Sequence, residues 1–113
     1  MKSSTTDKPW GSFTQFTHNE LSTVKTIFVK AGEQLSLQTH AKREEFWKVI
    51  SGTPTLTIGE EHIEAQPGDE FTIPAGLQHR IATTQENALI LEISTGDFDE
   101  NDIIRLEDKY GRS

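Results

Sequence analysis

The chain has 113 residues, 33% of them hydrophobic, a net charge of −7 and no cysteine. This length allows one compact domain, and the lack of cysteine excludes disulfides, thiolate zinc sites and cysteine nucleophiles. An acidic chain without a basic stripe argues against nucleic acid, and no apolar run approaches the roughly 18 residues of a membrane span.

Because the N-terminus also lacks the pattern of a signal peptide, we expect a cytoplasmic protein that does not bind a membrane. We expect one domain over residues 1–113, with the small polar residues 1–7 disordered. A bend at residues 8–11 carries Trp10, which is predicted to plug the core.

Short β-branched and apolar segments separated by turn signals follow one another along the rest of the chain. The expected strands are residues 12–17, 21–30, 33–39, 45–51, 55–58, 63–66, 70–73, 78–84 and 87–95. The one helical candidate is residues 100–108. This pattern predicts an all-β sandwich or barrel with at most a short C-terminal helix.

Four side chains in this pattern are candidate metal ligands. Gln38 and His40 are two residues apart, so they would project from the same face of a strand. After a charged bend, Glu45 can reach the same side, and a later segment supplies His79. Imidazole nitrogens with carboxylate or amide oxygens suit zinc, manganese, iron, cobalt or nickel, and a set without thiolates is typical of catalytic sites.

Two long motifs contain these four residues. They read Gly32-x5-Gln38-x-His40-x4-Glu45-x6-Gly52 and Gly68-x5-Pro74-x-Gly76-x2-His79-x3-Thr83. Their order and spacing resemble the two motifs of the cupin family, although cupins usually have His in place of Gln38 and Asn in place of Thr83. The resemblance implies a small double-stranded β-helix, a jelly-roll-like barrel, with the metal inside.

Gln38 and five longer phrases extend the resemblance. The phrases are KPWGSF (8–13), VKAGEQLSLQTH (29–40), EFWKVISGT (45–53), PGDEFTIPAGLQHRI (67–81) and NDIIRLEDKYGR (101–112). They resemble the C-terminal isomerase domain of type II mannose-6-phosphate isomerase/mannose-1-phosphate guanylyltransferase. The resemblance implies a divalent metal ion, with zinc favoured and manganese, cobalt, nickel or iron as alternatives. It also implies a homodimer.

The function that this resemblance implies is an aldose–ketose isomerase, a metal-dependent mannose-6-phosphate isomerase acting through a cis-enediol. Such a reaction needs a metal, a base and cations that hold the phosphate of the sugar phosphate. Arg43 matches an Arg of the family and is a candidate for both binding and catalysis, beside the candidate bases Lys42 and Glu44. The further candidate substrate-binding cations are Lys8, Arg80 and Arg105.

One departure from the family favours an alternative function. The family often has three consecutive histidines where this chain reads His40-Ala41-Lys42. The alternative is a non-catalytic, metal-binding cupin that binds a sugar phosphate or acts beside a separate nucleotidyltransferase. A third possibility, another cupin chemistry such as a dioxygenase, is disfavoured by Gln38 and by the family-like C-terminal segment.

Overall fold

The computed structural model describes residues 3–112, and within them the chain forms strands and no helix. In chain order the strands are β1 (Ser4–Lys8), β2 (Gly11–Gln15), β3 (Ser22–Val29), β4 (Leu37–Thr39), β5 (Arg43–Ser51), β6 (Thr55–Ile58), β7 (Glu61–Glu64), β8 (Glu70–Ile73), β9 (His79–Ala82), β10 (Ala88–Gly96) and β11 (Ile104–Glu107). The predicted all-β fold class is confirmed.

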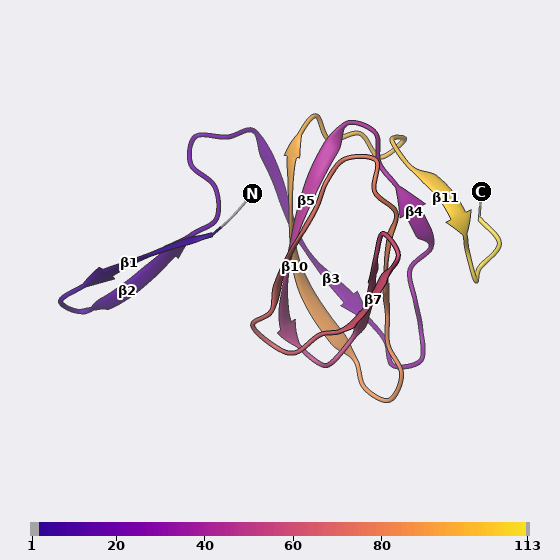
Figure 1. Ribbon diagram of the computed structural model, residues 1–113, viewed down its shortest axis with the longest axis horizontal. Helices are drawn as coiled ribbons and strands as arrows, with labels where there is room; N and C mark the ends of the chain where they lie inside the picture. Colours follow the sequence, from indigo (N-terminus) through magenta and orange to yellow (C-terminus); the bar gives the residue numbers. More distant parts are fainter. Residues whose placement is uncertain (1–2, 113) are drawn as a thin grey trace.

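Two antiparallel sheets face each other and form the body of the molecule, while a separate hairpin projects from it (Figure 1). One sheet has the strand order β3-β10-β5-β8, and the other has the order β11-β4-β9-β6-β7. From β3 to β10 the chain passes repeatedly between the two sheets, as in a jelly roll. The interior of the barrel is the space between the sheets.

The alternation of side chains on the central strands directs every second residue into this interior. On β5 and β10, Glu45 lies opposite Ser94, and Val49 lies opposite Ile90. All four side chains are buried, so one end of the interior is polar and the other end is apolar. The apolar end contains Val29, Trp47, Val49, Leu56, Ala65, Ile73, Ile81, Ala88 and Ile90.

The end of β5 shows why one motif glycine is needed. The pairing of β5 with β10 skips Ile50, which is therefore a β-bulge. Gly52 follows with a φ of 83°, and a Cβ atom there would lie only 2.3 Å from the carbonyl oxygen of Asn87. Neither the backbone conformation nor the space at this turn accepts a side chain.

The N-terminal residues differ from their prediction. Residues 1–7 were expected to be disordered, but Ser4–Lys8 form β1 and pair with β2 in the projecting hairpin (Figure 1). Residues 1 and 2 lie outside the described residues. Trp10 lies at the hairpin turn and is 73% exposed, so its predicted place in the core is wrong. Phe16, just after the hairpin, packs against Phe46 on the barrel with ring centroids 5.7 Å apart.

The predicted C-terminal helix, residues 100–108, is also wrong. Ile104–Glu107 form β11, which pairs with β4. Pairing covers what would otherwise be an exposed sheet edge, whereas an isolated helix of this length is marginal in water. Across residues 3–112, no helix is long and apolar enough to span a membrane.

Candidate metal centre

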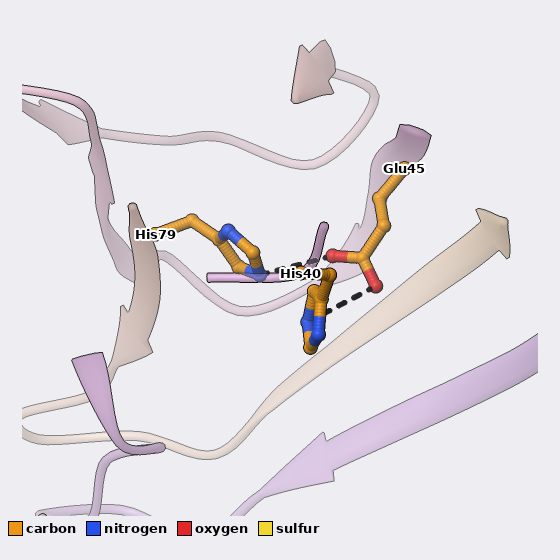
Figure 2. A group of neighbouring side chains, drawn as sticks. All are labelled: His40, Glu45 and His79. Atoms are coloured by element: carbon orange, nitrogen blue, oxygen red, sulfur yellow. Dashed lines mark ion pairs between the residues drawn. The ribbon is translucent and has the colours of Figure 1, made fainter. Parts of the chain in front are cut away.

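Three side chains from different parts of the barrel converge in its polar end (Figure 2). His40 follows β4, Glu45 lies on β5 and His79 begins β9. Their ligand atoms all lie within 4.8 Å of one another, and all three residues are buried. His79 Nε2 is 3.1 Å from Glu45 Oε1, and His40 Nε2 is 3.7 Å from Glu45 Oε2.

A backbone carbonyl group orients each histidine ring. His40 Nδ1 lies 2.7 Å from the carbonyl oxygen of Asp102, and His79 Nδ1 lies 2.9 Å from that of Leu77. Because a carbonyl oxygen only accepts, both Nδ1 atoms carry a proton, and in the neutral form of each ring the Nε2 atom then presents its lone pair on the side of Glu45. Metal-bound histidines are oriented in the same way.

The facing lone pairs indicate a site for a cation. Glu45 Oε1 and His79 Nε2 are buried and have no hydrogen-bond partner. Two acceptor atoms 3.1 Å apart repel each other unless a positive charge lies between or beside them. A divalent ion on His40, Glu45 and His79 would satisfy both atoms, so these residues fit a metal ion of the nitrogen- and oxygen-binding kind.

Two distant segments hold the loop that carries His40. At the corner after β8, Gly76 N donates a hydrogen bond of 2.7 Å to the carbonyl oxygen of His40. From the C-terminal side, the Asp102 carboxylate accepts hydrogen bonds from Ala41 N at 2.8 Å and Lys42 N at 2.9 Å. These two bonds lower the pKa of Asp102. The C-terminal segment therefore also holds the loop that carries His40, and this role of Asp102 was missed by the sequence analysis.

Arg43 packs directly against the ligand set. Its side chain is 6% exposed, its Nε is 3.3 Å from Glu45 Oε2, and its Nη2 is 3.2 Å from His40 Nε2. Its guanidinium carbon lies 4.3 Å from the ring centroid of Phe98. Burial works to raise the pKa of Glu45, but His79, His40 and Arg43 together lower it. Burial lowers the pKa of His40, which favours the neutral imidazole that a metal requires.

A cavity of about 220 Å³ adjoins the ligand set. Of the predicted substrate-binding cations, Arg43 and Arg105 line it, whereas Lys8 lies on the projecting hairpin. Arg80 turns away from the cavity, and its Nε donates to the carbonyl oxygen of Leu35 at 2.9 Å. The lining residues are Lys25, Ile27, Leu35, Ser36, Gln38, His40, Arg43, Glu45, Glu92, Glu100, Ile103, Arg105 and Arg112.

The remaining predicted site residues are placed as follows. Lys42 is exposed in the bend before β5, and Glu44 alternates with the inward-facing Glu45, so neither lines the cavity. Gln38, the fourth predicted ligand, does line the cavity. Its amide oxygen accepts a hydrogen bond from Ser36 Oγ at 2.8 Å.

Among the cavity residues that the sequence analysis did not identify are Glu92 on β10 and Lys25 on β3. In the predicted strand 87–95 the odd-numbered residues form the more apolar face, but the structure turns the even-numbered face inward. Glu92 is 4% exposed, and burial, followed by the charge of Glu45, raises its pKa. A lone carboxylate in a strand that is apolar on both faces was the available signal.

Comparison with known proteins shows the family of the chain. Residues 2–108 match the family described as mannose-6-phosphate isomerase C-terminal. The chain belongs to this family. It is 39% identical over 108 residues to the xanthan biosynthesis protein XanB of Xanthomonas campestris pv. campestris. This alignment covers 94% of this chain and 23% of XanB. It is also 36% identical over 107 residues to the mannose-1-phosphate guanylyltransferase ManC of Salmonella typhimurium. That alignment covers 93% of this chain and 22% of ManC.

The fold of this family member also resembles solved cupins. A cupin protein from Bacteroides fragilis superposes with a TM-score of 0.62 at 26% identity, over 66% of this chain and 65% of that one. The predicted cupin fold is therefore confirmed.

The relatives correct the predicted function. XanB and ManC carry the names of a xanthan biosynthesis protein and a guanylyltransferase, and the chain spans less than a quarter of either one. The prediction that this chain is itself a mannose-6-phosphate isomerase is wrong by this finding, although the family description contains that name. ManC is named a mannose-1-phosphate guanylyltransferase, and this name agrees better with the alternative prediction.

Proposed function

We propose that this chain is a metal-binding cupin module that binds a sugar phosphate and acts beside a nucleotidyltransferase. The observation that carries the proposal is the set of three buried ligand atoms, within 4.8 Å of one another, at the wall of a cavity. His40, Glu45 and His79 would hold the ion, with Gln38 as the fourth ligand beside them.

Zinc is the favoured ion, because two imidazoles and one carboxylate without thiolates form a common zinc site. Two neutral histidines and one carboxylate leave a divalent ion with a net positive charge. When bound, the ion would act as a Lewis acid that attracts an oxygen atom of the ligand.

The charges around the cavity support a phosphorylated ligand. Lys25, Arg43, Arg105 and Arg112 line it, although Arg43 is paired with Glu45, Lys25 with Glu92 and Arg112 with Asp108. Arginine recognises phosphate through paired N–H donors. The names of the relatives point to a mannose phosphate as the first ligand to test.

The test is calorimetric titration of the metal-loaded and the chelator-treated protein with mannose 6-phosphate and mannose 1-phosphate. We expect one metal ion per chain, and sugar-phosphate binding that requires it. His79→Gln should lose both, whereas His62→Gln, an exposed residue on β7, should lose neither. Absence of bound metal, or equal sugar-phosphate binding with and without metal, would overturn the proposal.

The association with a nucleotidyltransferase has its own test. The relatives combine a region like this chain with about three times its length of other sequence. We expect the purified chain to form a complex with the remaining portion of ManC in sedimentation experiments. Independent sedimentation of the two proteins would contradict this part of the proposal and leave the ligand-binding part standing.

A further inference from the structure

Glu92 occupies a distinctive position in the wall of the cavity. It lies in the middle of β10, directly between Lys25 on β3 and Trp47 on β5 in the strand register. The three residues form one row across the sheet. The neighbouring row on the same face contains Ser94 and Glu45, so Glu92 lies one step along the sheet from the candidate metal ligand.

The two carboxylate oxygens of Glu92 have different surroundings. Oε2 accepts a hydrogen bond of 3.1 Å from the indole nitrogen of Trp47. Oε1 is buried and has no hydrogen-bond partner, and Lys25 Nζ lies 3.6 Å from it. The side chain of Glu92 is 5% exposed. Buried carboxylate oxygens are rarely left without a donor, because their desolvation is costly.

The missing partner of Glu92 Oε1 must be a hydrogen-bond donor. An ionised carboxylate only accepts hydrogen bonds and repels a phosphate, so Glu92 would face the hydroxyl-bearing part of a ligand. The Lys25 ammonium compensates the carboxylate charge from the adjacent strand. On the other side of the cavity, the C-terminal segment contributes Arg105 and Arg112, which suit the phosphate.

We propose that Glu92 accepts a hydrogen bond from a hydroxyl group of the bound sugar phosphate through Oε1, with Lys25 as its counter-ion. The ligand then lies with its hydroxyl groups toward β3 and β10 and its phosphate toward residues 105–112. Glu92 thereby distinguishes phosphorylated polyhydroxy sugars from other phosphates. This inference rests on the sugar-phosphate binding proposed above.

The first test is Glu92→Gln in the metal-loaded protein, with mannose 6-phosphate and inorganic phosphate as probes. Loss of a hydrogen bond to a charged group should weaken mannose 6-phosphate binding roughly 10- to 100-fold. Metal content and the affinity for inorganic phosphate should stay unchanged. Glu64→Gln, an exposed residue on β7, is the matched control and should behave as wild type.

A second test separates hydroxyl recognition from a structural role. We expect one member of a series of deoxy analogues of mannose 6-phosphate, each lacking one hydroxyl, to bind the wild type more weakly than the parent sugar. Glu92→Gln should bind that analogue and the parent equally. A structural defect would instead weaken every analogue by the same factor.

Lys25→Gln supplies a second variant if Glu92→Gln does not fold. The Lys25 side chain is 42% exposed, so its replacement should be tolerated. It should reduce mannose 6-phosphate affinity less than Glu92→Gln and reduce discrimination against the same analogue. If the metal-loaded wild type binds no sugar phosphate, both proposals fail. If it binds and the two variants bind all analogues as the wild type does, only the role of Glu92 fails.

Discussion

The two ends of the barrel interior are built by the same strands but have opposite chemistry. β5 places Glu45 in one end and Val49 in the other, and β9 does the same with His79 and Ile81. Trp47 lies at the boundary, with its ring edge-on to His79 at 5.4 Å and its indole nitrogen bonded to Glu92. A step of two to four residues along a strand therefore separates the core from the site.

This contrast shows how the barrel can hold buried charges. Burial of apolar side chains stabilises the fold, whereas burial of carboxylates, imidazoles and a guanidinium costs free energy unless they are paired. The apolar end supplies stability, and the polar end keeps its charges close to one another and to the cavity. Substitutions at the two ends should accordingly change different quantities.

The largest expected effect on folding is at the apolar end. Leu56 is 0% exposed, and Leu56→Ala should lower the free energy of unfolding by about 3 kcal/mol through lost burial and a cavity. Metal affinity should be unchanged. Leu106→Ala, at a residue 52% exposed, is the matched control and should cost less than about 0.5 kcal/mol in urea unfolding. Similar losses for both variants would contradict the separation of the two ends.

The largest expected effect on metal binding is at the polar end. Glu45→Gln keeps the side-chain volume but removes the only carboxylate among the three facing ligands, so metal affinity should fall at least about 100-fold. Competition with a chromophoric chelator measures this affinity. Glu44→Gln changes the neighbouring residue, which does not line the cavity, and should retain wild-type affinity. Equal affinities of the two variants would rule out the assigned ligand set.

The pH dependence of stability should also originate at the polar end. Burial lowers the pKa of His40 from 6.5, so below that pH the unfolded state binds more protons than the folded state. The contribution of neutral His40 is therefore complete above pH 6.5 and is lost as the pH falls toward the folded-state pKa. Urea unfolding of the metal-free protein should show this decline, and His40→Gln should reduce it. Stability that rises as the pH falls through this range would contradict the assignment.

The smallest expected effect is in the C-terminal segment, at the ion pair between Asp108 and Arg112. The bond with the Arg112 guanidinium lowers the pKa of Asp108 from 3.8 to about 2. Arg112→Gln should return the pKa of Asp108 toward 3.8, as measured by NMR titration of its carboxyl carbon. Lys109→Gln is the control and should leave this pKa near its wild-type value. The core end of the barrel should show no chemical-shift change in either variant.

The sequence predicted the strands with clear alternation and the residues with clear ligand chemistry. The ranges predicted for 55–58 and 70–73 agree with β6 and β8, and His40, Glu45 and His79 do converge. The predicted strand 33–39 is reduced to Leu37–Thr39, which pairs with β9 and β11, whereas Gln34 forms only an isolated bridge with Ala82 of β9. The residues of this segment do not by themselves determine which part of it pairs with a neighbouring strand.

The errors share a physical cause, which is tertiary contact that local pattern does not reveal. The segment 100–108 has helix-like apolar spacing, but part of it pairs as a strand with the edge of β4. Glu92 was overlooked because both faces of its strand are apolar enough to be buried. Asp102 lies outside the two motifs, and its contribution depends on a hydrogen bond to a loop 60 residues away in the chain.

The bond between Asp102 and His40 makes the C-terminal segment a reporter of metal occupancy. The ion and this segment hold the same loop from opposite sides, so binding of one should favour ordering of the other, by reciprocal linkage. Backbone amides in residues 99–107 should then exchange with deuterium more slowly in the metal-loaded protein. Removal of this segment would leave the ligand residues present but His40 without the carbonyl group that sets its tautomer.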